Sequence, residues 1–368
     1  MRSAPVIPAW VSADGPAKDV VLSTRARLAR NVRGSPFPSR AREADLRRVA
    51  NLALEALSVI ESEGRFGRLR VLQPERLRSA GQRLALADTY LASRQHARSG
   101  DYRPVALDEP AELSLMVNEE DHLRIQCILA GLQPLAALEK VRGFDACLAR
   151  RIAYVRTDNY GYLTASLANV GTALRLSVML HLAGLALLDE AVPALTAAAH
   201  LKISVRGAFG EGTKAFGHIY QVSNETAIGF TEQDITLRVR GAAEHLVSRE
   251  REARRKLAAE KPDELTRRVE CAYSRLMEAQ ALRGTEALED LSMLRLGAEL
   301  GLGPKLSPRG FKELLVSIRL GESVSGGESV GSEVRRAGLI RARLMEENQI
   351  AQLAFPEEQE QPTRRQIR

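Results

Sequence analysis

The sequence predicts an α+β protein whose chain ends in a helical region, and three patterns carry this prediction. Residues 123–127 alternate, with Leu123, Ile125 and Cys127 on one face, which is the period of a half-buried strand. Residues 41–63 place apolar side chains at helical spacing, which is typical of an amphipathic helix that serves as scaffold. After residue 231, charged segments with helical periodicity follow one another to about residue 355.

Length and composition indicate a soluble protein of one large or two medium domains. The chain has 368 residues, 45% hydrophobic and 27% charged, with a mean hydropathy of -0.19. No apolar run is long enough to span a bilayer and the first ten residues lack an export signal, so we expect a cytoplasmic protein. Cys127, Cys147 and Cys271 share no metal-like spacing, which predicts buried thiols in a reducing compartment.

The net charge of +7 raises the question of a nucleic-acid partner. The basic residues are dispersed along the chain and only 4% of the residues are aromatic, which argues against one. We therefore predict that the protein binds neither nucleic acid nor membrane. Most of the positive charge is arginine, so a phosphate site in this chain would have to use arginine.

An acidic cluster stands directly before the predicted strand at residues 123–127. It contains Asn118, Glu119, Glu120 and Asp121. Carboxylates at the mouth of a strand are costly to keep ionised without solvent or a cationic partner, so the cluster predicts a site that receives a cation. Arg124 returns to the side that the acids reach. The alternative interpretation is a solvated acidic turn.

A second strand, within residues 19–31, carries alternating arginines. Arg25 and Arg27 would share one face. Two guanidinium groups side by side repel each other, so this pattern favours an anion such as polyphosphate between them. A solvated edge strand is the alternative.

Further elements follow in order. We predict strands at 65–72 and 112–117, helices at 81–95 and 134–152, a short strand at 153–156 and a turn at 157–161. The second half of residues 162–182 is apolar enough for a buried helix with Arg175 near its start, where the charge would need a partner or an anion at the helix N-terminus. His181 is predicted to be a core histidine.

A third arginine-bearing strand, residues 201–206, leads into a glycine-rich loop at 207–213. Such a loop lets the backbone pass close to a ligand, so Arg206 could lie on a phosphate and Glu211 on an acceptor. The alternative is a mobile hairpin. The nucleotide-binding loops of P-loop proteins and of ordinary protein kinases do not occur in the sequence.

Taken together, these segments resemble the phosphagen (guanidino) kinase family, most closely its bacterial protein-arginine kinase branch. The resemblance covers nearly the whole chain, and the motifs that carry it are STRARLARN at 23–31, NEEDHLRIQ at 118–126, NVGT at 169–172 with Leu174 and Arg175, VRG at 205–207 and GEG at 210–212. It implies a glutamine-synthetase-like antiparallel sheet flanked by helices, followed by an all-α domain. We expect a catalytic domain at 1–250, a helical C-terminal domain at 251–355 and a disordered polar tail at 356–368.

The resemblance also implies roles for individual residues. Glu120 and Glu211 would be the catalytic acid-base pair, and ATP with Mg²⁺ would be the cofactors. The implied ATP-binding residues are Ser23, Thr24, Arg25, Ala26, Arg27, Tyr90, Arg124, Arg175, Leu176, Ser177, Val178, Met179, Arg206, Gly207, Ala208, Phe209 and Gly210. Ser166 and Asn169 would belong to a substrate loop.

The sequence departs from the family pattern at several positions. Tyr90 stands where a histidine is usual, Ser166-Leu167-Ala168 replaces Cys-Pro-Thr, and Ala173 replaces a glycine. Near the C-terminus, Ser332, Glu333 and Arg336 correspond to the branch's phosphoarginine pocket, but Ser332 replaces its first arginine. These departures predict an altered nucleotide pocket and a weakened response to phosphoarginine.

The leading hypothesis is an ATP-dependent protein-arginine kinase that marks proteins for Clp-type degradation. The alternatives are a kinase of a small guanidino metabolite and a catalytically weak pseudokinase that binds phosphoarginine. The implied partners are proteins with exposed arginines, a zinc-binding activator protein and a Clp unfoldase, and the family relationship implies a homodimer.

Overall fold

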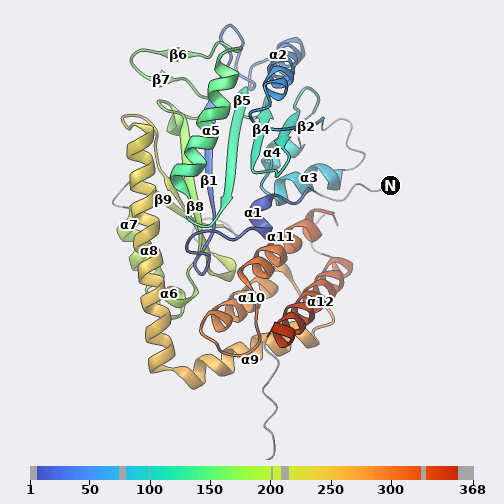
Figure 1. The fold of residues 1–368 in the computed structure, drawn as a ribbon, viewed down its shortest axis with the longest axis vertical. Helices are drawn as coiled ribbons and strands as arrows, with labels where there is room; N and C mark the ends of the chain where they lie inside the picture. The colour runs from blue at the N-terminus through green and yellow to red at the C-terminus, as the bar shows by residue number, and fades with distance from the viewer. Residues whose placement is uncertain are drawn as a thin grey trace, which may run out of the picture.

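An antiparallel sheet occupies the first part of the chain (Figure 1). The computed structural model describes residues 6–73, 80–98, 100–199, 202–208, 215–324 and 329–354. Within these residues the sheet has eight strands in the order β2-β3-β4-β5-β1-β8-β10-β9, and each neighbouring pair is antiparallel. The strands are β1 Val21–Arg30, β2 Leu69–Leu72, β3 Val105–Asp108, β4 Leu113–Val117, β5 Leu123–Ala130, β8 Leu174–His181, β9 Ile203–Gly207 and β10 Ile219–Asn224. A separate hairpin consists of β6 Arg156–Thr157 and β7 Gly161–Tyr162.

Helices cover one face of this sheet, and the main apolar core lies beneath them. These helices are α2 Glu43–Ser62, α5 Pro134–Ala149 and α8 Glu232–Glu260; in Figure 1, α5 lies in front of the strands and α8 stands at the left of the sheet. The even-numbered side chains Ala26 and Leu28 of β1 enter the core and are fully buried. Because side chains alternate along a strand, Arg25 and Arg27 must point to the other face. The predicted scaffold helix at 41–63 is confirmed as α2.

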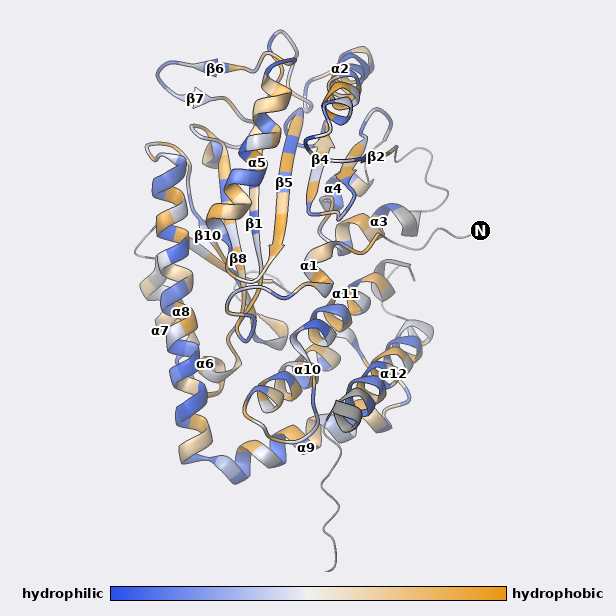
Figure 2. Ribbon diagram, in the orientation of Figure 1, coloured by the Kyte–Doolittle hydropathy of each residue, from blue (hydrophilic) through white to orange (hydrophobic). Residues whose placement is uncertain are grey.

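The last four helices form a second core. They are α9 Pro262–Glu278, α10 Gly284–Glu299, α11 Pro308–Val324 and α12 Val330–Ala354, and their apolar stripes meet around Leu291 and Phe311 (Figure 2). Met179 of β8 and Ile219 of β10 belong to this same cluster. The helical region therefore packs directly against the end of the sheet, and the predicted α+β fold with a helical C-terminal region is confirmed.

Short helices join the larger elements. They are α1 Ala9–Ser12, α3 Ala80–Asp88, α4 Arg94–Arg98, α6 Ala183–Leu187 and α7 Ala191–Ala199, with 3₁₀ turns η2 at Leu167–Asn169 and η3 at Phe216–His218. Among the described residues, no helix has both the length and the apolar character needed to cross a membrane. Helix α8 runs through the predicted boundary at residue 250, so the division into domains stays a prediction, and the predicted tail at 356–368 lies outside the described residues.

The predicted helix in the second half of residues 162–182 is wrong, because these residues form strand β8. Leu174, Leu176, Val178 and Leu180 do alternate into the main core. The residues between them, Arg175, Ser177, Met179 and His181, lie on the other face, so the strand does have a period of two. The helix prediction failed because the apolar residues continue past the strand through Leu182 and Leu185, which makes the segment resemble a buried helix. Arg175 consequently lies in a central strand and not at a helix N-terminus.

Smaller differences concern element bounds. The predicted helix at 81–95 ends at Asp88, and α4 begins only at Arg94. Tyr90, between them, has a φ of 63°, a left-handed conformation that a helix cannot accommodate. The predicted strand at 65–72 begins at Leu69, and that at 153–156 is replaced by β6. Cys271 is exposed, so the prediction of three buried thiols is wrong for it.

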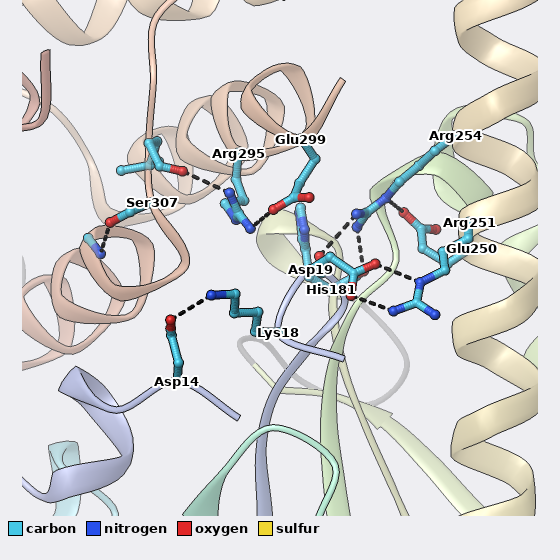
Figure 3. A network of polar contacts seen from close by, with 12 residues as sticks. Asp14, Lys18, Asp19, His181, Glu250, Arg251, Arg254, Arg295, Glu299 and Ser307 are labelled. Atoms are coloured by element: carbon cyan, nitrogen blue, oxygen red, sulfur yellow. Dashed lines mark hydrogen bonds and ion pairs between the residues drawn. The ribbon is translucent and has the colours of Figure 1, made fainter. Parts of the chain in front are cut away.

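A polar network holds the ends of β1 and β8 against α8 (Figure 3). Arg251 forms two hydrogen bonds to the Asp19 carboxylate at 2.7 and 2.6 Å, just before β1. Arg254 donates to the Asp19 carbonyl at 3.0 Å and to the buried Glu250 at 2.7 Å. Glu250 in turn accepts the backbone N–H groups of Gly184 and Leu185 after β8. These contacts fix the relative position of the two strands that carry the central arginines.

Candidate active site

Five arginines from four strands converge on the sheet face opposite the main core. They are Arg25 and Arg27 of β1, Arg124 of β5, Arg175 of β8 and Arg206 of β9. The strand register aligns them, since Arg27 lies opposite both Arg175 and Gln126, and Arg206 lies opposite Gln221. We refer to these five residues as the arginine cage. The prediction that Arg25 and Arg27 share a face is confirmed.

The arginine cage gathers positive charges, and most of its side chains are at least partly buried. Burial, followed by the neighbouring charges of Arg124, Arg206 and Arg175, lowers the pKa of Arg25 to about 9. Burial, followed by repulsion from Arg25 and Arg124, also holds the pKa of Arg27 well below its usual range. Like charges at this density are stable only with a compensating anion, so the site is suited to a polyanionic ligand.

Few protein groups offer hydrogen-bond acceptors to the guanidinium groups of the arginine cage. Arg25 donates to the Gln221 side chain at 3.3 Å, and Arg175 donates to the Ser223 hydroxyl at 3.3 Å. The buried Nε atoms of Arg27 and Arg175 have no hydrogen-bond partner among the residues that the structure describes. A guanidinium group with unused donors can offer a fork to phosphate oxygens.

Glu119 is the one carboxylate that pairs directly with the cage among the described side chains. It accepts from Arg124 at 2.6 Å, from the Ser93 hydroxyl at 2.6 Å and from the Glu120 backbone N–H at 2.8 Å. Burial alone would raise the pKa of Glu119, but Arg124 and these hydrogen bonds lower it to about 2. Glu119 is therefore a fixed anion that orients Arg124.

Glu120, the next residue, has a different environment. Its side chain is exposed, whereas Glu119 is 5% exposed. Partial burial and the nearby charges of Asp121 and Glu119 raise the pKa of Glu120, and Arg124 and Arg27 oppose this shift only in part. An accessible carboxylate of raised basicity next to a cationic cage can accept a proton, which Glu119 cannot do at neutral pH.

Asp121 and His122 fix the acidic cluster to its surroundings. Asp121 is buried and accepts from the Asn31 amide at 2.6 Å and from the Ala165 backbone N–H at 2.7 Å. His122 accepts the Val32 N–H at its Nδ1 atom and contacts the Pro36 carbonyl at its Nε2 atom, so it is the neutral Nε2-protonated tautomer. These bonds tie the end of β1, the acidic cluster and the loop after β7 together.

That loop contains the predicted substrate-loop residues Ser166 and Asn169. The Ser166 carbonyl accepts from the Thr164 hydroxyl at 2.8 Å and from the Asn169 N–H at 3.0 Å, which forms a compact turn. Leu167 at its tip is 85% exposed. The loop is thus anchored beside Glu120 through Asp121 and presents an apolar side chain to solvent.

Tyr90 closes one end of the cage. A pocket beside the cage is lined by Trp10, Arg25, Tyr90, Ile128, Met179 and Gln221, together with the predicted residues Ser23 and Ser177. It combines two aromatic rings with apolar side chains directly next to the arginines. The pocket thus places aromatic and apolar side chains beside arginines that can bind phosphate.

Not every predicted nucleotide-binding side chain faces this site. Thr24 donates to the Gly131 carbonyl at 2.6 Å, and Ala26, Leu176 and Val178 lie in the main core. Any nucleotide contact from these four would have to use backbone atoms. Gly207 ends β9 opposite Tyr220, Ala208 packs against the helical core, and Phe209, Gly210 and the predicted catalytic Glu211 lie outside the described residues.

The three residues predicted for a phosphoarginine pocket lie at the start of α12. Ser332 is 2% exposed, and its hydroxyl donates to the Ser329 carbonyl at 2.8 Å. Arg336 is buried and donates to the Leu282 carbonyl at 2.6 Å, while Glu333 is half-buried. The two inner side chains of this group are therefore used within the helical region itself.

The structure adds four side chains that sequence reasoning did not single out: Trp10, Ser93, Gln221 and Arg319. Ser93 and Gln221 bind Glu119 and Arg25, and Arg319 binds Tyr90. Their sequence signal is weak because each lies outside the motifs and reaches the site only through the tertiary fold. The lone tryptophan was the one residue of this group that its rarity could have marked.

Comparisons with known proteins define the class. The model of the ATP:guanido phosphotransferase C-terminal catalytic domain matches residues 48–253, and that of the protein-arginine kinase McsB C-terminal domain matches residues 262–354. The chain belongs to the ATP:guanido phosphotransferase family and is therefore a phosphotransferase.

Within the family, relatives of similar length carry a more specific name. The chain is 38% identical over 339 residues to a protein-arginine kinase of Symbiobacterium thermophilum, covering 91% of this chain and 96% of the relative. It is 36% identical to the protein-arginine kinase of Geobacillus stearothermophilus, with 92% and 94% covered.

Solved structures support the fold. Lombricine kinase superposes with a TM-score of 0.55 at 21% identity, covering 68% of this chain and 72% of the other. The duplicated taurocyamine kinase of Schistosoma mansoni gives 0.58 at 22% identity, with 76% and 40% covered. At these identities the likeness is one of fold.

Proposed function

We propose that the protein is an ATP-dependent protein-arginine kinase, which transfers the γ-phosphate of ATP to arginine side chains of other proteins. The observation that carries the proposal is the exposed Glu120 carboxylate, which lies beside a cage of five arginines on one sheet face. The relatives at 35–38% identity that share the C-terminal helical region support the protein substrate. The exposed acceptor side, with Leu167 at its rim, also favours a large substrate.

The chemistry needs an anion-binding cage and a base. A substrate guanidinium is a poor nucleophile while protonated, so a carboxylate must accept a proton as the terminal nitrogen attacks the γ-phosphorus. The new N–P bond forms, the bond from phosphorus to the bridging oxygen of ADP breaks, and the proton passes to Glu120. Arg27, Arg124 and the other cage residues hold the phosphates in line and stabilise the transferring group.

Mg²⁺ fits this scheme as a partner of the nucleotide. Among the described residues, no group of three or more His, Cys, Asp or Glu side chains comes together to hold a metal ion. The guanidinium groups of the cage repel free cations, so we propose that Mg²⁺ enters bound to ATP phosphate oxygens, where it neutralises part of their charge. Glu211, outside the described residues, is proposed as the second carboxylate.

Further aspects of the proposal rest on the family relationship. We propose that the modified proteins are marked for Clp-type degradation in the cytoplasm, that a zinc-binding protein activates the enzyme and that it works as a homodimer. The predicted roles of Ser23, Tyr90, Ser177 and the loop residues Ser166 and Asn169 in binding ATP and substrate belong to the same proposal.

One experiment separates the proposed function from its alternatives. The purified protein is incubated with ATP, Mg²⁺ and either an arginine-rich protein such as casein or free arginine, and acid-labile phosphate is mapped. Phosphoarginine in the protein supports the proposal. Phosphate on the free amino acid alone indicates a small-metabolite kinase, and no transfer combined with phosphoarginine binding indicates a pseudokinase.

A further inference from the structure

Tyr90 connects the arginine cage to the C-terminal helices, and both of its backbone ends are fixed. Its N–H donates to the Ala87 carbonyl at 3.1 Å, and its carbonyl accepts from the Gln126 side chain of β5 at 2.6 Å. The backbone is left-handed, with a φ of 63°, which is unfavourable for a tyrosine and therefore needs such support. The ring is consequently held at a fixed place above the sheet.

Two guanidinium groups and an indole surround this ring. The Arg25 guanidinium carbon lies 5.8 Å from the ring centroid and that of Arg319 lies 4.4 Å away. The Tyr90 hydroxyl accepts a hydrogen bond from Arg319 Nη1 at 2.8 Å, and Trp10 meets the ring edge-on at 6.0 Å. Arg25 belongs to the cage, whereas Arg319 belongs to α11, so a single side chain bridges the two parts of the molecule.

Helix α11, which carries Arg319, is held against the segment around Trp10. The Lys312 ammonium group of α11 is buried and donates to the Trp10 carbonyl at 2.9 Å and to the Ala13 carbonyl. Val316, one turn further along α11, packs with Trp10 and Ile128 in a small apolar cluster. Helices α1 and α11 therefore form one wall, and Arg319 extends from it onto Tyr90.

The contact between Tyr90 and Arg25 affects how readily Arg25 keeps its charge. Burial and repulsion from the other arginines lower the pKa of Arg25, whereas Tyr90 raises it. A cation over a tyrosine ring is attracted by the ring's negative face, and the strength depends on how the ring is held. Removing the hydroxyl contact with Arg319 would free the ring to turn, and Arg25 would lose part of its support.

We propose that Arg319 is a positioning residue for the nucleotide site: through Tyr90 it holds Arg25 and the adjacent pocket in the form that binds ATP, so that the C-terminal helices contribute to nucleotide affinity. This inference rests on the proposed function. Because Arg319 touches neither Glu120 nor the acceptor loop, its loss affects the KM and Kd for ATP and leaves kcat nearly unchanged.

Trp10 provides a direct measurement, because it is the only tryptophan of the chain and lines the pocket. ATP with Mg²⁺ is titrated into the full-length protein without acceptor, and the Trp10 emission and the Kd are recorded. The variants are Tyr90→Phe, which keeps the ring, Arg319→Met, and the double variant. The matched control is Arg309→Met, an exposed arginine of the same helix that pairs with Glu313.

We expect Tyr90→Phe and Arg319→Met each to raise the Kd and KM for ATP by about five- to tenfold. The double variant should be no weaker than the weaker single variant, and Arg309→Met should match the unmodified protein. Unchanged Kd and Trp10 emission in both single variants would overturn the inference, as would a loss of kcat at unchanged KM, which indicates a merely structural role. If the unmodified protein itself binds no ATP, the proposed function fails and the inference with it.

Discussion

Arg27 of β1 lies directly opposite Arg175 of β8 in the centre of the sheet, so two cations occupy neighbouring positions on one face. Arg27 is 9% exposed, and no carboxylate forms an ion pair with either residue among the described side chains. Like charges placed directly opposite each other weaken a strand pair. The ligand-free fold therefore carries a local free-energy cost that a bound polyanion would offset.

The first prediction follows from this pair. Arg27→Met should raise the free energy of unfolding of the ligand-free protein by about 0.5 to 2 kcal/mol, because it removes a buried repulsion while keeping a long apolar stem. The same variant should no longer be stabilised by ATP, since binding raises stability only through the native site. Thermal unfolding with and without ATP measures both effects.

The control for this prediction is Arg240→Met, which removes an exposed arginine on α8 that pairs with Glu244. It should change the unfolding temperature little and keep the full ATP-dependent shift. A less stable Arg27→Met protein in the absence of ligand would contradict the argument from charge repulsion.

The second prediction concerns Glu120. Glu120→Gln preserves the shape of the side chain but removes the proton acceptor, so phosphoryl transfer should fall by several orders of magnitude (on the order of 10²–10⁴ from acid-base work alone) while ATP still binds. Glu139→Gln, an exposed change on α5 across the sheet, serves as the control. Near-normal transfer by Glu120→Gln would remove Glu120 from the mechanism.

The pH dependence of the rate adds a second measurement for Glu120. Because burial and the neighbouring acids raise its pKa above the ordinary 4.5, its deprotonated, active form is lost at a higher pH than for a free glutamate. We expect kcat/KM to decline on acidification from above pH 4.5. Rate profiles of the unmodified protein that stay flat through this range would contradict the role of a carboxylate base.

The sequence predicted which residues form this site better than it predicted the strands that carry them. The alternation of Arg25 and Arg27 was visible because β1 has an apolar and a polar face. Strand β8 was mistaken for a helix because its apolar residues run on into the apolar segment that follows it, and with it the position of Arg175 opposite Arg27 was lost. The alternation of Leu174, Leu176 and Val178 with Arg175 and Ser177 is nevertheless the period that identifies a strand.

The connections made by tertiary structure were not predictable in the same way. The hydrogen bond between Tyr90 and Arg319 joins residues that are 229 positions apart. No local pattern marks such a pair, because a single arginine on an amphipathic helix is most often a solvated side chain. Similarly, the sequence showed four acidic or amide residues in a row, but only the fold distinguishes the buried Glu119 from the exposed Glu120.

The third prediction uses this difference. Glu119 has a folded pKa of about 2, below its ordinary value of 4.5, so its stabilising contribution is present above pH 4.5 and is lost as the pH falls toward 2. Glu119→Gln should lower stability at pH 6 by about 1 to 3 kcal/mol, because it leaves Arg124 without its anion.

The measurement is urea unfolding of both proteins at pH 6 and at pH 3. The difference between the unmodified protein and Glu119→Gln should shrink on acidification, because below pH 4.5 the unfolded chain takes up a proton at Glu119 that the folded protein does not bind until the pH approaches 2. The pKa values of Asp121 and Glu120 shift the other way, and burial is the largest cause of both shifts, so most of their contribution is common to the two proteins. A difference that is independent of pH would show that Glu119 acts by shape and not by charge.

The last prediction concerns the start of α12, where Ser332, Glu333 and Arg336 correspond to the predicted phosphoarginine pocket. The Arg336 guanidinium is buried and donates to the Leu282 carbonyl, and the Ser332 hydroxyl is bonded to Ser329. A phosphate would have to displace these internal contacts and would find a hydroxyl where an arginine fork is needed, which costs about 1.5 to 3 kcal/mol of binding free energy. We therefore expect free phosphoarginine to change the kinase rate little.

Arg336→Ala should lower the unfolding temperature without altering that response, because it removes a bond between α12 and the segment before α10. Kinase assays with increasing phosphoarginine, run beside thermal unfolding of both proteins, test this directly. A strong saturable response that disappears in Arg336→Ala would mean that Arg336 leaves Leu282 to bind the ligand.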